Sequence, residues 1–512
     1  MLAKVLSSAT LGIDAYAVEV EVDLSGGLPF FSTVGLPDNA VKESKDRVRS
    51  AIKNSGYKFP GKRITVNLAP ADIKKEGTAF DLPVAAAILK AEGVIAENGL
   101  EGYCIVGELS LDGRVKPVRG ALSVAVCVRA LNKKLIVPFD NQREAAVVQG
   151  AAVYGVKTLT ELVEFINGTI NLEPYGTAGV ECLLPQRGIH PDLSDVRGQE
   201  HVKRALEVAA SGGHNMIMIG PPGSGKTMLA KRLPALMPSM SMDEAIETTK
   251  VWSVAGMLDD GRSIVIERPF RAPHHTISDV GLIGGGKFPR PGEASLAHNG
   301  VLFLDEMPEF KRGSLEALRQ PMEDGKVSIS RAVASVTFPS VFMLVGAMNP
   351  CPCGYLGDAR RECICTPIQV GNYRSRLSGP LLDRVDIHCE VVAVRFSELS
   401  GEASGEKSTD VQKRVEAARA AQSNRFGERE GGARVFSNSR MTSRQTRKHC
   451  KLSSESMRLL ETAVLRLGLS ARAYTRVLKV ARTIADLEGE ANIAPCHISE
   501  AIQYRALDRP AV

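Results

Sequence analysis

The sequence predicts an α/β protein built from three parts, on three observations. The chain has 512 residues, which is too long for one hydrophobic core and indicates two or three domains. From Ser194 to about Val394, apolar runs alternate with helical patterns, which is typical of a parallel sheet covered by helices. Residues 1–170 mix strand-like and helical segments, whereas the chain after Val411 is helical and rich in arginine. We therefore expect an α+β domain, a parallel-sheet domain and a helical C-terminal domain.

Composition indicates an ordinary globular protein, with 44% hydrophobic and 24% charged residues. No apolar run approaches the roughly 18 residues needed to cross a bilayer, and the first residues lack the apolar region of a secretory signal. We therefore predict a cytoplasmic protein without membrane contact, whose ten cysteines stay reduced. The net charge of +6 permits nucleic-acid binding but does not demonstrate it.

The first part of the chain shows both strand and helix signals. Ala15–Val22 and Arg63–Asn67 alternate apolar and polar residues, as a half-buried strand does. Asp38 is suited to cap a helix that runs to Asn54. Residues 171–193 are richer in Gly and Pro, without a clear period, and we interpret them as a linker.

A phosphate-binding motif follows a short apolar strand. The strand His214–Ile219 leads directly into Gly220–Thr227, and a helix is expected over Met228–Leu236. This is the pattern G-x-x-x-x-G-K-[ST] in its strand–loop–helix context, in which backbone N–H groups and the helix N-terminus bind phosphates. The expected ATP-binding residues are Gly220, Pro221, Pro222, Gly223, Ser224, Gly225, Lys226 and Thr227. Lys226 would neutralise the outer phosphates, and the Thr227 hydroxyl would ligate Mg²⁺.

Two acidic residues end a second apolar strand. Val301–Leu304 is followed by Asp305 and Glu306. A buried parallel strand would deliver Asp305 to Mg²⁺ at its carboxyl end, with Glu306 placed to polarise the attacking water. A third apolar strand, Val341–Ala347, is followed by Asn349. An Asn before proline often makes an ordinary turn, but its order after the acids favours a role at the same site.

Four of the ten cysteines fall within fifteen residues. The order C-x-C, nine residues, C-x-C places Cys351, Cys353, Cys363 and Cys365 in one loop. Four thiolates could hold a tetrahedral Zn²⁺. The spacing differs from the usual C-x-x-C pattern, and four reduced thiols without a metal are the alternative. The adjacent His274–His275 would point to opposite faces of a strand, which disfavours joint metal ligation.

The order of these motifs resembles that of AAA+ ATPases. The resemblance implies that Asn349 senses the γ-phosphate and that Arg384, within Ser378–Asp386, is a finger inserted into the neighbouring subunit's site. It implies that Arg472 closes the lid on nucleotide, with Arg476 as the competing residue. The simpler alternative for Arg384 is a surface ion pair with Asp386, which would contribute little.

Four longer segments resemble the ComM/YifB family of magnesium-chelatase-like AAA+ proteins. They are Phe270–Asp279, Pro291–Gly300, Leu318–Glu323 and Asn349–Gly354. The resemblance implies ATP- and Mg²⁺-dependent branch migration and unwinding of DNA by a homo-hexamer, in natural transformation and homologous recombination. Its implied partners are single-stranded or branched DNA and recombination proteins. A protein-remodelling or metal-chelatase-type ATPase is the alternative function.

Two basic segments are suited to bind DNA. Residues 326–338 alternate around a short turn, which predicts a β-hairpin with Arg331 near its tip. Lys287 and Arg290 lie in a glycine-rich loop. In related ring motors such hairpins and loops line the pore, where contact with phosphates is independent of sequence. The alternative is that these residues are ordinary exposed bases.

The first domain resembles a Lon-type protease domain in the segments Phe31–Asp38, Asn67–Asp72 and Lys75–Pro83. Ala79 stands where the family has its serine, and Val124 aligns with the lysine. Neither side chain can act as nucleophile or base, so we expect a protease fold without protease chemistry. The predicted division is 1–170 (Lon-like), 171–193 (linker), 194–396 (ATPase core), 397–434 (helical connection) and 435–512 (helical lid).

Overall fold

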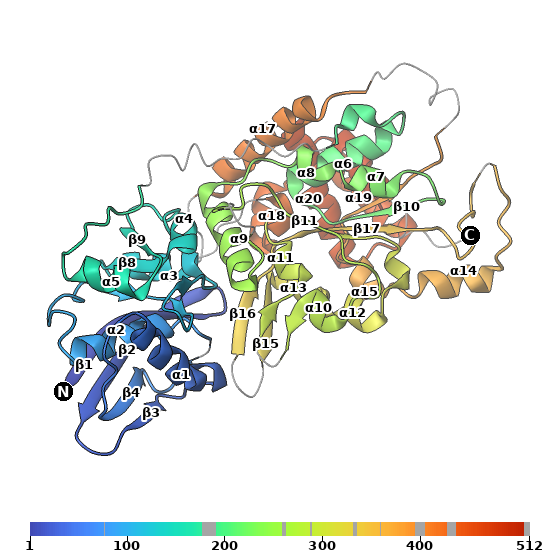
Figure 1. Cartoon of the computed structure of the whole chain (residues 1–512). Helices are drawn as coiled ribbons and strands as arrows, with labels where there is room; N and C mark the ends of the chain where they lie inside the picture. Colours follow the sequence, from blue (N-terminus) through green and yellow to red (C-terminus); the bar gives the residue numbers. More distant parts are fainter. Residues whose placement is uncertain are drawn as a thin grey trace.

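The computed structural model describes residues 1–75, 77–176, 191–258, 263–286, 289–330, 335–358, 360–394, 405–427 and 437–505. The chain forms two lobes that lie side by side, a smaller N-terminal lobe and a larger one that contains the C-terminal helices (Figure 1). Each lobe is built around its own main β-sheet. Among the described residues, no helix combines the length and the apolar composition needed to cross a bilayer.

The smaller lobe contains a mixed seven-stranded sheet. Its strands, in spatial order, are β3 (Phe30–Val34), β4 (Arg63–Ala69), β2 (Asp14–Ser25), β1 (Leu2–Leu11), β5 (Tyr103–Ile105), β8 (Lys134–Pro138) and β9 (Val153–Val156). One core contains α1 (Asn39–Asn54), α2 (Asp81–Ala91) and α5 (Leu159–Ile166), and another contains α3 (Ala121–Ala130) and α4 (Gln142–Ala145). A small ribbon, β6 (Glu108–Leu109) with β7 (Val115–Lys116), completes the lobe.

Local sequence signals for this lobe are confirmed. Asp38 caps α1, and its carboxylate accepts a hydrogen bond from the N–H of Val41 at 2.8 Å. Ala79 lies just before α2, and Val124 is buried within α3. Both of these residues, which were predicted to align with the serine and lysine of a Lon-type peptidase, have hydrocarbon side chains.

The larger lobe contains the predicted parallel sheet. Its strands, in spatial order, are β11 (Phe270–Arg271), β14 (Val301–Leu304), β17 (Met343–Met348), β10 (Met216–Ile219) and β18 (Ile387–Glu390), all parallel. Successive side chains of β10 point to opposite faces: Met216 and Met218 enter one core, and Ile217 and Ile219 the other. The sheet is covered on both faces, which explains why its strands read as continuous apolar runs.

Helices cover the two faces of this sheet. One face carries α6 (Glu200–Gly212), α8 (Leu233–Leu236), α17 (Ser408–Phe426) and the C-terminal helices. The opposite face carries α10 (Asp279–Ile283), α11 (Glu293–Leu296), α12 (Arg312–Ala317), α13 (Arg319–Asp324) and α15 (Gly379–Leu382). The helix α14 (Pro367–Arg374) lies beside the carboxyl end of the sheet (Figure 1).

The helix predicted over Met228–Leu236 is wrong as one continuous element. The chain forms α7 (Lys226–Ala230) and, after a break, α8 (Leu233–Leu236). Pro234 explains the break, since it has no N–H to donate to the carbonyl four residues earlier and its ring would clash there.

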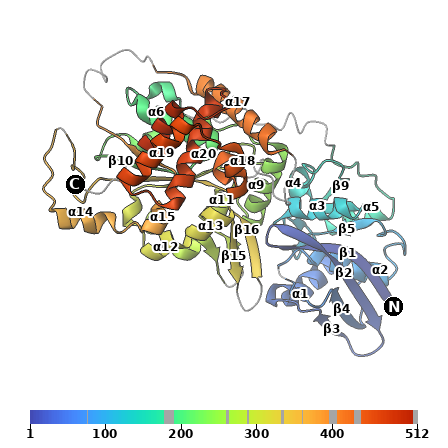
Figure 2. The same cartoon turned by 180° about the vertical axis from the view of Figure 1, so that it is seen from behind.

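The lobes meet through α9 (Met242–Ala255) and a hairpin. From α9, Lys250 forms a 3.0 Å ion pair with Asp14, and Ser253 donates a hydrogen bond to Glu144. The predicted hairpin is confirmed as β15 (Lys326–Ser330) and β16 (Ser335–Pro339). Its Val336 lies so close to Gly12 of the smaller lobe that a Cβ on that glycine would be 2.9 Å away. Both views show the hairpin beside this lobe (Figures 1 and 2).

The predicted helical lid is confirmed as a helical region that contains α18 (Ser443–His449), α19 (Ser454–Leu467), α20 (Ala471–Leu487) and α21 (Pro495–Gln503). The helix α20 packs on α6 and α17. The predicted boundaries at 396/397 and 434/435 lie outside the described residues, so the division into five segments stays a prediction.

A buried carboxylate attaches the lid to the sheet. Asp386, just before β18, is paired with Arg476 of α20 and with His214. It also accepts a hydrogen bond from the N–H of Asn215 at 3.1 Å. Burial alone would raise its pKa, but the charges of Arg476 and His214 and their hydrogen bonds hold the pKa of Asp386 well below its usual range.

Replacement of this carboxylate should loosen the lid. Asp386→Asn leaves the Arg476 guanidinium without its partner, and we expect the free energy of unfolding of the larger lobe to fall by about 3 kcal/mol. The measurement is urea denaturation followed by tryptophan fluorescence and by circular dichroism. The control is Asp410→Asn, because Asp410 pairs with Lys413 in solvent and should contribute less than about 0.5 kcal/mol. Equal effects of the two substitutions would contradict this assignment.

Candidate nucleotide site

The predicted phosphate-binding loop, Gly220–Thr227, lies at the carboxyl end of β10, which pairs with β17 on one side and β18 on the other. At Gly220 the chain passes so close to strand β18 that a Cβ would lie 2.1 Å from the carbonyl oxygen of Val391. Gly225 has φ of +89°, which an L side chain rarely adopts, and α7 starts at the next residue. The loop therefore presents the N-terminus of a helix to the space beyond the sheet, where phosphate groups bind well.

Lys226 is buried within this loop. Its ammonium group donates to the carbonyl oxygens of Gly220 at 2.7 Å and Pro221 at 2.8 Å, and to the side-chain oxygen of Asn349 at 3.3 Å. Burial lowers the pKa of Lys226 from its usual value. Lys226 and Asn349 are 123 positions apart in the chain, and both were predicted for this site. Their contact shows that the fold brings them together.

The predicted Mg²⁺ ligands are also brought together. The hydroxyl of Thr227, in the first turn of α7, donates to the carboxylate of Asp305, which follows β14, at 2.7 Å. The other oxygen of Asp305 accepts from the N–H of Glu306 at 2.9 Å. A hydroxyl beside a carboxylate is the oxygen pair that Mg²⁺ with bound phosphates uses, so these two residues fit the expected metal.

Glu306 faces a cavity with Asn349. Its backbone is left-handed (φ +50°, ψ +45°), and its side chain is 61% exposed. The cavity measures about 430 Å³, and its lining residues are Glu306, Glu309, Asn349, Pro352, Gln369, Asn372, Tyr373 and Arg376. Glu306 is therefore accessible to a water molecule next to the phosphate-binding loop, as a residue that polarises water must be.

His275 is a neighbour of Glu306 that sequence reasoning missed. Its Nδ1 lies 3.6 Å from a carboxylate oxygen of Glu306. The prediction that placed His274 and His275 on opposite faces assumed a strand. The two residues instead lie in a turn after β11, with ring centroids 4.1 Å apart. The adjacency of His275 to Glu306 depends on the parallel pairing of β11 and β14, which no local pattern reveals.

Arg384, predicted to enter the neighbouring subunit's site, and Arg472, predicted to close the lid on nucleotide, both lie at the other edge of the sheet. Arg384 is buried before β18 and pairs with Glu323 at the end of α13. Arg472, at the start of α20, is 59% exposed and lies 3.9 Å from the same Glu323 carboxylate. The hydrogen bond from Arg384 holds the pKa of Glu323 below its usual value. The suggested Arg384–Asp386 pair is wrong, because Asp386 is paired with Arg476 and His214.

The distance between the two edges is set by the strands. The side-chain amide of Asn215, just before β10, donates to the carbonyl of Arg384 at 3.0 Å, so Arg384 lies at the amino-terminal edge. The phosphate-binding loop begins after Ile219, four strand residues later, which corresponds to roughly 13 Å along the sheet. Within one chain, Arg384 and Arg472 are thus on the opposite edge from Lys226.

The predicted DNA-binding segments are described only in part. Arg290 is exposed in the small ribbon of β12 (Gly284–Gly285) and β13 (Arg290–Pro291). Lys287 and Arg331 lie outside the described residues. The ribbon packs on the hairpin, since a Cβ on Gly284 would be 3.1 Å from Ile329. The described parts of the two predicted segments therefore lie side by side on the larger lobe.

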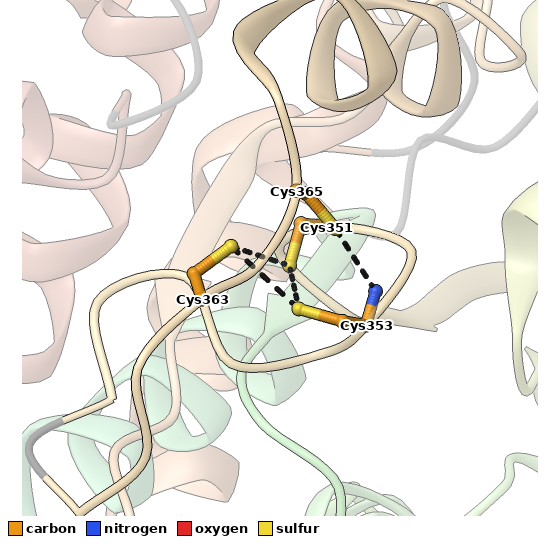
Figure 3. Close-up of side chains that lie close together, drawn as sticks. All are labelled: Cys351, Cys353, Cys363 and Cys365. Carbon is orange, nitrogen blue, oxygen red and sulfur yellow. Dashed lines mark hydrogen bonds between the residues drawn. The ribbon is translucent and has the colours of Figure 1, made fainter.

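The four predicted cysteines cluster. The Cys351 sulfur lies 3.3 Å from that of Cys353 and 3.6 Å from that of Cys363, and the N–H of Cys353 lies 3.4 Å from the Cys365 sulfur (Figure 3). All four sulfurs lie within 4.8 Å of one another. Such a cluster could hold a metal ion.

Comparisons with known proteins agree with this geometry. Three family models match the chain: "Magnesium chelatase, subunit ChlI" over residues 192–399, "Subunit ChlI of Mg-chelatase" over 20–141, and "Magnesium chelatase, subunit ChlI C-terminal" over 405–505. These matches cover most of both lobes.

Relatives match along nearly the whole chain. A protein named YifB from Escherichia coli is 46% identical over 511 residues, which covers 99% of this chain and 98% of YifB. Competence protein ComM from Haemophilus influenzae is 46% identical over 512 residues, with the same coverage of 99% and 98%. The magnesium-chelatase 38 kDa subunit of Rhodobacter capsulatus is 26% identical over 222 residues, 40% of this chain and 59% of that subunit.

Proposed function

The chain belongs to the family of magnesium-chelatase-like proteins that includes YifB and ComM, and from that premise we propose that it is an ATP-driven DNA motor. In this proposal identical subunits form a hexameric ring that drives branch migration and unwinding of DNA during recombination and transformation. The AAA+-type fold of the chain supports assembly into a ring. The name "competence protein", which ComM carries, supports DNA as the substrate.

The position of Arg384 is the single observation that carries the ring proposal. Lys226, Asp305 and Glu306 lie at the carboxyl edge of the sheet, whereas Arg384 lies at the amino edge, next to Asn215. A guanidinium contributes to phosphoryl transfer only when it contacts the phosphate oxygens. In a ring, the amino edge of one subunit would face the carboxyl edge of the next, and Arg384 would complete the neighbour's site.

Arg472 shares this role in the proposal. It is exposed and contacts the same carboxylate as Arg384. The competing residue Arg476 is engaged with the buried Asp386 and attaches the lid to the sheet. We therefore assign Arg472, rather than Arg476, to the nucleotide of the adjacent subunit, which changes the predicted closure of the lid within one chain into a contact between chains.

The remaining roles follow from the contacts of each residue. Lys226 would exchange its loop carbonyls for the outer phosphates, and the Thr227–Asp305 pair would hold Mg²⁺, which draws electron density from the phosphates. Glu306 would accept a proton from the attacking water. Asn349, which touches Lys226, would report the state of the γ-phosphate to β17.

The DNA contact is assigned to the hairpin β15–β16 and the ribbon β12–β13. The apolar face of the hairpin, with Val327 and Ile329, is buried in the core, whereas Ser328 and Ser330 are exposed. A hairpin held by its base can present a basic tip to the phosphate backbone. For the smaller lobe, which lies beside this hairpin, we propose a role in ring assembly or DNA guidance, together with a Lon-like fold.

The proposed cofactors are ATP with Mg²⁺, and Zn²⁺ in the four-cysteine loop. Thiolate sulfur is a ligand that Zn²⁺ prefers, and four such ligands complete a structural site.

Mixed rings test the role of Arg384 directly. Lys226→Ala removes the phosphate contact but keeps the arginine for the neighbour, and Arg384→Ala does the reverse. Each variant alone should lose at least about 10³-fold in ATP turnover. A random equal mixture should regain about a quarter of the wild-type rate, because a quarter of the interfaces combine two intact halves.

The control for this experiment is Arg466→Ala, which removes an exposed arginine of α19 and should leave turnover unchanged. The Arg384→Ala variant is expected to bind nucleotide as the wild type does, because its loop Gly220–Thr227 is unchanged. No recovery in mixtures that form mixed oligomers would contradict the proposal.

DNA binding should depend on the basic residues of the two segments. Changing Lys287, Arg290 and Arg331 to Ala should weaken binding equally for all DNA sequences. The slope of log binding constant against log salt concentration should fall in magnitude by about one per lost phosphate contact. The measurement is fluorescence anisotropy with forked and single-stranded DNA over a range of salt concentrations. Lys413→Ala, an exposed change on α17, is the control.

An ATP-hydrolysis assay with the same DNA molecules separates the two function classes. A DNA motor should hydrolyse ATP faster when single-stranded or forked DNA is added. Absence of both stimulation and binding at low salt would favour a protein-remodelling or chelatase-type ATPase.

A further inference from the structure

The four-cysteine loop has the ligand geometry of a tetrathiolate metal site. With Zn–S bonds of about 2.3 Å, tetrahedral sulfurs lie about 3.8 Å apart. The sulfurs of Cys351, Cys353 and Cys363 are 3.3–3.6 Å apart, and that of Cys365 lies within 4.8 Å of them. A disulfide would require about 2.05 Å. The sulfurs are thus too far apart to be bonded and are nearly at the separation that one metal ion requires.

The backbone of the loop supports the sulfurs as ligands. The N–H groups of Tyr355 and Ile364 donate to the Cys353 sulfur, and that of Cys365 donates to the Cys363 sulfur. The N–H of Cys353 in turn donates to the Cys365 sulfur at 3.4 Å. Donors that point at thiolates orient them and disperse their charge, as partners of metal ligands do.

One end of this loop forms part of the nucleotide site. Cys351 follows Asn349 after a single residue, and Pro352 lines the same cavity as Asn349 and Glu306. The loop then packs on the phosphate-binding loop, since a Cβ on Gly354 would lie 2.7 Å from the ring of Pro222. Gly354 also has φ of +87°, so both the space and the backbone favour glycine.

The other end of the loop leads into the opposite wall of the cavity. Cys365 precedes Thr366, which caps α14 through a capping box with Gln369. Two further residues of α14, Asn372 and Tyr373, line the cavity. The Tyr373 hydroxyl accepts a hydrogen bond from the N–H of Asn349. A link between the two ends of the loop would therefore fix both walls around Asn349.

We propose that Zn²⁺ bound by Cys351, Cys353, Cys363 and Cys365 holds the wall of the nucleotide cavity and positions Asn349 against the phosphate-binding loop. The inference rests on the proposed ATPase function and adds a dependence of that site on the metal. These cysteines are positioning residues, because they act on the nucleotide through Asn349, Pro352 and Pro222.

Metal content is the first measurement. Inductively coupled plasma mass spectrometry of the purified protein should find about one Zn²⁺ per chain. The double variant Cys353→Ser/Cys363→Ser should contain none. Co²⁺ substitution should give the visible absorption of a tetrahedral thiolate site. The control is Cys127→Ser, since Cys127 is a half-buried cysteine of α3 in the smaller lobe and lies outside the groups of described residues that could hold a metal ion. Wild-type protein without Zn²⁺ and without Co²⁺ absorption would overturn the proposal.

Nucleotide binding and turnover are the second measurement. In the double variant, ATP turnover should fall roughly 10²-fold, as a displacement of about 1 Å at a reacting site can cause, and the affinity for a fluorescent ATP analogue should fall about tenfold. The same losses should follow removal of the metal from wild-type protein by a chelator and should be reversed by adding Zn²⁺. This second route avoids a variant that fails to fold, and circular dichroism checks that the metal-free chain keeps its helices.

The outcomes distinguish this proposal from the proposed function. Full turnover and affinity in folded, metal-free protein would overturn the coupling while leaving the DNA-motor proposal intact. Absence of DNA stimulation in zinc-loaded protein would instead contradict the motor and leave the zinc site in place.

Discussion

The polarity of the parallel sheet is the constraint on which the rest of the structure depends. The loops that follow parallel strands all lie at one edge of the sheet. The loop Gly220–Thr227, Asp305 and Asn349 each follow a strand of this sheet, and they therefore lie close together. The same polarity sends the residues that precede the strands to the other edge, where Arg384 lies beside Asn215. Within one chain, the predicted nucleotide-binding residues therefore lie at one edge of the sheet, and Arg384 and Arg472 lie at the other.

Glu323 connects the amino edge to the segment assigned to DNA. Its carboxylate contacts both Arg384 and Arg472, and Lys326, the first residue of β15, follows three positions later. A shift of the arginines toward a neighbour's phosphate would remove the partners of Glu323 at the base of the hairpin. The lid shares in this arrangement, because Asp386 attaches α20 to the start of β18. The smaller lobe contacts the same hairpin through Gly12, so the hairpin lies between the two lobes.

The sequence predicted those parts of the site that a short segment specifies. The strand–loop–helix around Gly220–Thr227, the strand β14 before the two acids and the hairpin are each specified by a local pattern of residues, and each has the predicted backbone. The parts that depend on contacts between distant segments were missed or misassigned. His275 lies close to Glu306 because β11 pairs with β14, and Arg384 pairs with Glu323 because the end of α13 lies beside the residues that precede β18. The break at Pro234 was predictable from its missing N–H, but the helical pattern around it concealed the boundary.

The central claim, that each nucleotide site needs two chains, is tested most directly by ATP turnover per chain across a dilution series, with the oligomer mass measured in the same samples. The account predicts that turnover per chain falls as the oligomer dissociates and approaches zero for the monomer. Turnover that stays constant down to concentrations at which only monomer is present would contradict it.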